Sequence, residues 1–237
     1  MISTNRHLDI KIGEHAKGNS ECEKLLGVKI DVNLNFNNHI SDLCKKASRK
    51  ISALARVAPF MSFNKRKLLM NAFFTSQFSY CPLIWMCHSH LNNRKINRLH
   101  ERCLRIIYND KQSSFDELLN KDSSVSIHIR NLQKLAIEMF KFYKGLSPPI
   151  MDNVFRLRTD NPYNLRQASE FSRPIVKTVY HGSESISYLG PKIWDMLPEN
   201  LRNMEHLQTF KKEIKIWEPN NCPCRLCKVY IEGVGFL

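Results

Sequence analysis

Between Ile40 and Ala58 the apolar residues recur every three or four positions, which is the spacing of a single apolar stripe along an α-helix. Two further segments with helical spacing follow, at residues 64–80 and 92–109. A short helix is expected at 114–119, and a longer one at 129–145 has apolar residues on every side, which is typical of a buried helix. These patterns predict a mainly helical protein.

The ends of the expected elements are marked by short signals. Residues 8–12 and 25–31 have the pattern of short strands that could pair as a hairpin. Asn37 and Asn38 are expected to cap the first helix, because their side chains can accept from free backbone N–H groups. Pro82 is expected to end or kink the second helix.

Beyond residue 145 the sequence favours loops, a strand-like stretch at 175–180, and two helices at 190–197 and 206–217. The expected fold class is mainly α: a helical bundle preceded by a short β-hairpin and followed by an α-rich C-terminal extension and a Cys-rich tail. The expected divisions are a hairpin segment at 1–34, a basic helical domain at 35–121, a helical extension at 122–217 and the tail at 218–237.

The chain is strongly basic. It has 36 Lys and Arg against 22 Asp and Glu, a net charge of +14, which favours a polyanionic partner. Residues 41–110 hold 13 of the cations and three of the anions, so most of the net charge lies on the first three expected helices. The alternatives are a solvated surface and a surface that binds an acidic protein or lipid.

The candidate phosphate contacts on the helices are among the cations that fall off the apolar stripes. On the third helix the arginines recur at spacings of four, four and three residues, so they project from one face. The full set on the helices is Lys45, Lys46, Arg49, Lys50, Arg94, Lys95, Arg98, Arg102 and Arg105.

Several classes of enzyme site have no sequence signature in this chain. No two acidic residues stand together as Asp-Asp, the paired carboxylates that hold metal ions in nucleotidyl transfer. Glycine-rich phosphate loops and the GxSxG and HExxH patterns are absent as well. The Cys and His residues at 81–90 are spaced by aromatic and apolar residues, which favours a packed helix end over a metal or catalytic site. No catalytic residue is assigned.

The tail contains three thiols within six residues, Cys222, Cys224 and Cys227. Three thiolates can bind one Zn²⁺, and His206, Cys44 or a partner chain could supply the fourth ligand. Reduced structural thiols and a redox role are the alternatives. A zinc ion is therefore a possible cofactor, and none is required.

Nothing in the sequence favours secretion or membrane insertion. The first residues lack an apolar signal region, and the uncharged stretch at 68–93 is interrupted by polar residues and Pro82. We expect an intracellular protein without a transmembrane segment.

A succession of motifs resembles the region downstream of the catalytic palm in non-LTR retrotransposon reverse transcriptases, most closely the jockey/CR1-like group. The resemblance covers residues 22–237. It rests on LGVKID at 26–31, FNNHI at 36–40, SYCPLIW at 79–85, LHERCLRIIY at 99–108, SYLGPKIWD at 187–195 and CPCRLC at 222–227.

The resemblance implies that residues 1–34 are the remnant of the palm and primer grip, and that the helices at 35–121 correspond to the thumb. Such a thumb grips the template–primer duplex, an RNA–DNA hybrid. Lys29, in the strand that resembles the primer grip, would then lie beside the primer end and is a further, weaker candidate contact. The family's catalytic carboxylates and their Mg²⁺ belong to a palm upstream, so this chain is expected to have no polymerase activity alone. A 5′-truncated element would produce such a chain. A nuclear location is suggested only by the family.

Two alternatives to a nucleic-acid-binding fragment remain open. One is a zinc-dependent interaction protein built on the tail cysteines, and the other is a transposon remnant without a function.

Overall fold

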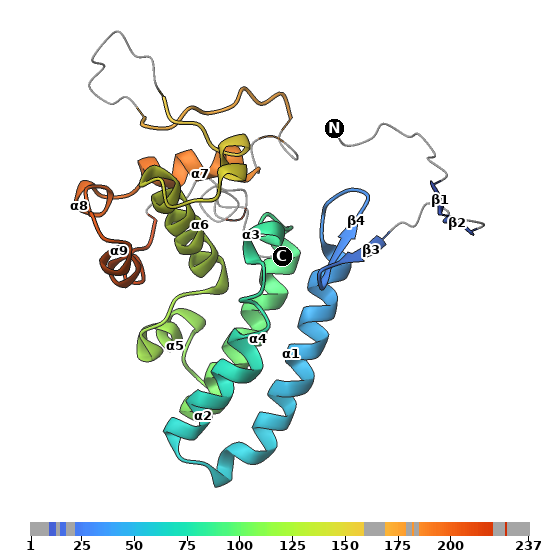
Figure 1. Cartoon of the computed structure of the whole chain (residues 1–237). Coiled ribbons are helices and arrows are strands. Elements are labelled where there is room, and N and C mark those ends of the chain that lie inside the picture. The colour runs from blue at the N-terminus through green and yellow to red at the C-terminus, as the bar shows by residue number, and fades with distance from the viewer. Residues whose placement is uncertain are drawn as a thin grey trace.

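The structure is a computed structural model that describes residues 10–12, 15–17, 22–158, 169–178, 182, 185–219 and 226 (Figure 1). Two antiparallel hairpins precede the helices: β1 (Ile10–Ile12) pairs with β2 (His15–Lys17), and β3 (Cys22–Leu25) pairs with β4 (Val28–Asp31). The expected pairing of 8–12 with 25–31 is therefore wrong. A two-residue turn closes β3 onto β4, since Leu26 and Gly27 both have positive φ, at 46° and 88°.

Helix α1 (Asn37–Val57) follows the predicted apolar stripe. Ile40, Ala47, Ile51 and Leu54 are completely buried. The helix begins differently from the expectation, because neither Asn37 nor Asn38 caps it. Instead the Asp31 carboxylate accepts hydrogen bonds from the backbone N–H groups of residues 35 and 36, at 3.0 and 2.7 Å. The end of β4 is thereby tied to the start of α1.

The second expected helix is divided into shorter elements. Helix α2 (Phe63–Met70) passes into a π-helical turn, η2 (Asn71–Thr75), and regular helix does not continue to residue 80. Pro82 begins the short helix α3 (Pro82–Trp85) rather than ending the one before it. Proline is favoured at this position because its missing N–H would have no helical partner there.

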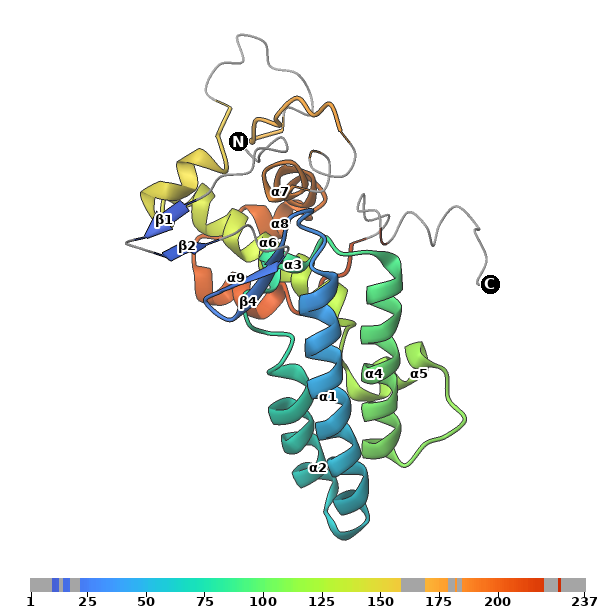
Figure 2. The same cartoon turned by 90° about the vertical axis from the view of Figure 1, so that its right-hand side faces the viewer.

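Helix α4 (His90–Tyr108) lies beside α1 and runs parallel to it (Figure 2). Near the start of both helices, the Asn92 amide donates to the Asn37 side-chain oxygen at 2.7 Å. Further along both helices, the Arg102 guanidinium donates to the Ser52 hydroxyl at 3.3 Å. The buried edge of α4 differs from the predicted one: Ile96 and Cys103 are buried as expected, whereas Leu99 and Ile106 are half-buried and His100, Leu104 and Ile107 complete the edge.

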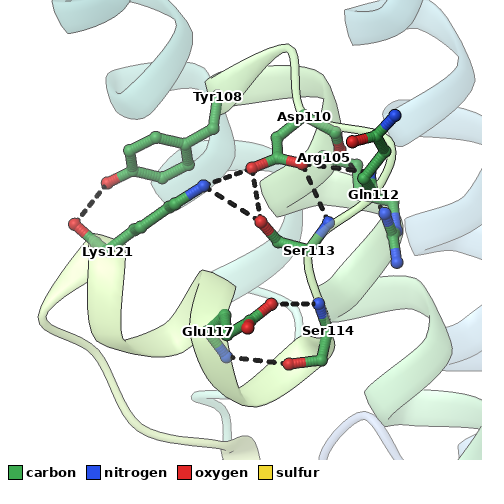
Figure 3. A network of polar contacts seen from close by, with 8 residues as sticks. All are labelled: Arg105, Tyr108, Asp110, Gln112, Ser113, Ser114, Glu117 and Lys121. Atoms are coloured by element: carbon green, nitrogen blue, oxygen red, sulfur yellow. Dashed lines mark hydrogen bonds and ion pairs between the residues drawn. The ribbon is translucent and has the colours of Figure 1, made fainter.

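A network of side chains fixes the connection from α4 to α5 (Phe115–Asp122), as Figure 3 shows. The Asp110 carboxylate accepts from the backbone N–H groups of Gln112 and Ser113 and from the Lys121 ammonium. Ser114 and Glu117 then form a capping box at the start of α5.

The remaining helices enclose a second apolar cluster. They are α6 (Ile127–Tyr143), η3 (Pro149–Asn153), α7 (Ile186–Asp195), α8 (Glu199–Arg202) and α9 (Leu207–Glu213). The first cluster is built on α1, η2 and α4, whereas the second is built on α6, α7 and α9. The two clusters meet at α3, where Trp85 belongs to the first and Met86 to the second. The division of the chain into domains stays a prediction.

The C-terminal part differs from the sequence predictions in four places. Residues 175–178 form no strand. Helix α7 begins at Ile186 and accommodates Gly190 and Pro191 in its interior, whereas we expected a start at Gly190. The last expected helix ends at Glu213, four residues before Trp217, and α8 was not predicted.

Among the helices that the structure describes, none combines the length and the apolar character needed to cross a membrane.

Candidate nucleic-acid interface

The parallel pair α1 and α4 presents cations on its outer surface. At 100° per residue, Lys45, Arg49 and Arg56 lie about 160–180° from the buried Ala47, so they project away from the core. All three are exposed. They occupy the solvent side of α1 along most of its length.

Cations of α4 line the seam that this helix forms with α1. The Arg102 guanidinium reaches across it to the Ser52 hydroxyl. Lys95 lies close enough to Cys44 for its charge to favour the thiolate, although burial has the larger effect and raises the pKa of the Cys44 thiol to about 11. Arg94 and Arg98 are exposed on the outward side of the same helix. We call this set the basic face: Lys45, Arg49, Arg56, Arg94, Lys95, Arg98 and Arg102.

Lys46 and Lys50 lie outside the basic face. The Lys50 ammonium lies 6.0 Å from the centroid of the Phe73 ring of η2, and Lys46 lies one turn before Lys50 on the same side of α1. Both residues are accessible, Lys46 more than Lys50. Around the axis of α1, Lys46 lies about 60° from Arg49 and therefore borders the basic face, whereas Lys50 lies about 140° from Lys45.

Two further candidates are neutralised by carboxylates. The Lys29 ammonium lies 2.6 Å from a carboxylate oxygen of Asp42, and this hydrogen bond raises the pKa of Lys29 and lowers that of Asp42. The Arg105 guanidinium donates to Glu101 at 2.7 and 3.2 Å. Asp42 and Glu101 are the only acidic residues within α1 and α4. Each carboxylate is thus paired with a cation outside the basic face, and Asp42 also lies close enough to Lys45 and Lys46 for their charges to lower its pKa.

The stretch of sequence between Asp42 and Glu101 is free of acidic residues. Residues 43–100 contain no Asp or Glu. Arg56 lies in this segment and belongs to the basic face, although it was not among the predicted contacts. The sequence feature that indicates its exposure is its position off the apolar stripe of α1.

A hollow of about 240 Å³ lies where the β3–β4 hairpin meets α1. Its lining mixes both signs of charge, which distinguishes it from a simple anion site. The lining residues are Cys22, Glu23, Lys24, Lys29, Asn38, Ser41, Asp42 and Lys45.

The predicted zinc ligands Cys222, Cys224 and Cys227 lie outside the described residues. Of the suggested fourth ligands, His206 is exposed at the start of α9 and Cys44 is a half-buried thiol disfavoured as a thiolate. Leu226, between two of the tail cysteines, is buried in the second apolar cluster. No group of three metal-binding side chains occurs within the part of the chain that the structure describes.

Of the Cys and His residues at 81–90, His88 is buried, Cys81 and Cys87 are half-buried and His90 is exposed. The ring of His88 is parallel to that of Trp85, with centroids 6.1 Å apart and planes at 11°. Burial lowers the pKa of His88 to about 4, so this histidine is neutral at physiological pH.

Comparison with known proteins finds no matching family model, no similar curated protein and no similar solved structure. The resemblance to retrotransposon reverse transcriptases therefore stays a prediction from the sequence motifs.

Proposed function

We propose that this chain binds the sugar–phosphate backbone of a nucleic-acid duplex through the basic face, as the template–primer grip of a retrotransposon RNA-directed DNA polymerase. The observation that carries the proposal is the convergence of seven exposed cations from two parallel helices onto one surface. The carboxylates on these helices are compensated by Lys29 and Arg105.

The dimensions of the basic face suit a backbone. Lys45 and Arg56 are separated by about 17 Å along the helix axis, at 1.5 Å per residue. Successive phosphates on one strand are about 3.4 Å apart along a duplex, so several of them fit within this span. Rigid helices carrying Lys and Arg contact phosphates without reading base sequence.

An RNA–DNA hybrid is the preferred ligand in this proposal. Its form is close to that of an A-form duplex, in which the wide minor groove is recognised by shape, sugar and phosphate. The hybrid is also the product that the resembled enzymes hold. Since the sequence has no paired catalytic carboxylates, binding without polymerisation is expected of this chain alone.

The test is a titration of a fluorescent RNA–DNA hybrid with the full chain at several salt concentrations. A variant with Lys45, Arg49, Arg98 and Arg102 changed to Gln removes four members of the basic face. The control variant changes Arg156, Arg158, Lys212 and Lys215 to Gln, which are equally exposed but lie elsewhere. Both variants carry the same reduced net charge.

For the wild type, log K should fall steeply with log salt. The basic-face variant should have a slope shallower by about 0.9 for each phosphate that it no longer neutralises in a B-form duplex, with a similar size for the hybrid. The control variant should retain most of the wild-type slope. Equal slopes for the two variants would mean that only net charge matters. The basic face would then be a solvated surface, and the zinc-dependent or remnant alternatives would be favoured.

A further inference from the structure

The far end of the α1–α2 hairpin exposes an aromatic ring. Phe60 ends the short 3-10 turn η1 (Ala58–Phe60) between the two helices, and 90% of its surface is accessible. In both views this turn is the extremity of the helical part of the molecule (Figures 1 and 2). Val57, Phe63 and Leu68 are exposed beside it, Leu68 to 69%.

The turn that carries Phe60 is held in place from both sides. Ala58 is buried, and its carbonyl oxygen accepts a hydrogen bond from the Met61 N–H at 3.1 Å. Pro59 restricts the backbone before Phe60. On the α2 side, the ring of Phe63 packs edge-on against Tyr108 with centroids 5.3 Å apart. The Phe60 ring is therefore presented to solvent by a fixed support.

The surroundings of Phe60 are cationic. Arg56, a member of the basic face, precedes it by four residues, and Lys65 is exposed in the first turn of α2. The turn lies within the segment without Asp or Glu. An exposed aromatic ring with cations on both sides is the arrangement that single-stranded nucleic acid prefers, because bases stack on the ring and phosphates meet the cations.

We propose that Phe60 stacks on an unpaired base where a single strand leaves the duplex bound on the basic face. The inference rests on the proposed function and adds a second class of ligand, a single-stranded extension. Stacking on one ring accepts any base, with a preference for the larger purines.

An anionic membrane is the competing occupant of an apolar, cationic tip. The cations of the basic face extend from Arg56 along α1 for about 17 Å away from the tip. That span exceeds the screening length of about 8–10 Å at physiological salt, so a membrane touching Phe60 would leave Lys45 without an electrostatic partner. A strand that runs along α1 and past the tip meets all of these groups.

The experiment compares a blunt RNA–DNA hybrid with the same hybrid extended by about four unpaired adenosines. The wild-type chain should bind the extended hybrid about tenfold more tightly. Phe60→Ala and Phe60→Leu should remove this advantage and leave binding of the blunt hybrid unchanged. Phe60→Trp should retain the advantage, because it keeps a stacking ring. Ile216→Ala, at another exposed apolar site, is the control and should behave as the wild type.

Each contrary result has a separate meaning. Equal binding of the two hybrids by the wild type, or full retention of the advantage in Phe60→Leu, overturns the stacking site and leaves the duplex grip intact. Failure of the wild type to bind either hybrid overturns the proposed function itself. Tight binding to phosphatidylserine vesicles that Phe60→Ala abolishes and Phe60→Leu retains would assign the tip to a membrane instead.

Discussion

The imidazole ring of His100 stacks on the ring of Phe74, with centroids 4.8 Å apart and planes at 23°. His100 is completely buried in the first apolar cluster, and Phe115 packs edge-on against its other side at 5.4 Å. Burial lowers the pKa of His100 to about 3, with a further lowering by Arg130 and an opposing effect of Asp122. The folded protein therefore excludes a proton that the unfolded chain accepts near pH 6.5.

The pH dependence of stability follows from this difference. The contribution of neutral His100 is fully present above about pH 6.5 and is lost as the pH falls toward 3, at up to about 1.4 kcal/mol per pH unit. His88 acts in the same direction, since its pKa is lowered to about 4. His100→Phe, which retains an aromatic ring at the site, should flatten the decline between pH 7 and 5 in urea unfolding. The same decline in wild type and variant would contradict this assignment.

The interior of α7 leaves no space for a side chain at Gly190. A Cβ at this position would lie 2.6 Å from the Met139 Sδ and 2.8 Å from a ring carbon of Phe155. Gly190→Ala should lower the free energy of unfolding by about 1–3 kcal/mol, because the packed neighbours must move. Denaturant unfolding measures the change. Gly145→Ala provides the comparison: its Cβ meets nothing within 4 Å, and its cost should come only from the backbone φ of 68°.

The start of α5 offers a local test (Figure 3). The Ser114 hydroxyl accepts from the Glu117 N–H at 3.3 Å, and the Glu117 carboxylate accepts from the Ser114 N–H at 2.7 Å. Ser114→Ala should lower the free energy of unfolding by about 1 kcal/mol, because the first turn loses a cap. Gln112→Ala should have little effect, since its backbone N–H makes the contact with Asp110. Equal effects of the two substitutions would show that the cap is not important.

The tail cysteines can be tested by metal analysis. If they bind zinc, purified protein should contain about one Zn²⁺ per chain, and changing Cys222, Cys224 and Cys227 to Ser should remove it. Cys22→Ser, at a half-buried strand position, should retain the metal. A zinc content well below one per chain in the wild type would argue for reduced thiols.

The helices could be predicted because the spacing of their apolar residues identifies the positions that are buried in the fold. The stripe from Ile40 to Ala58 identifies α1 within a residue at its C-terminal end, and Gly145 ends α6 with a positive φ of 68°, as a C-cap glycine does. The hairpin pairing was missed because it depends on Leu26 adopting positive φ, for which leucine carries no sequence signal. The start of α7 differs from the expected Gly190 because proline is favoured in the first turn of a helix, whereas Pro191 lies in the interior of α7.

The sequence predicts most of the cations that are exposed, but it does not show which of them share one surface of the folded chain. Helical spacing places Lys45 and Lys46 on different flanks of α1, and only the packing of α4 shows which flank adjoins the other arginines. Lys29 lies in β4 and Asp42 lies in α1, so no local sequence pattern predicts their ion pair. Phe60 was overlooked because a single aromatic residue after a proline resembles an ordinary turn.

The parallel direction of α1 and α4 has a consequence for when the basic face forms. Parallel neighbours cannot be joined by a short loop, so Ser52 and Arg102, which meet at the seam, are fifty positions apart in the sequence. A chain still emerging from the ribosome, or a fragment cut at the α1–α2 turn, carries the cations of α1. It lacks the basic face, which forms only when α4 packs beside α1. If the chain binds a duplex as proposed, its affinity should increase only when folding is complete, and the duplex should in turn protect the folded state from unfolding.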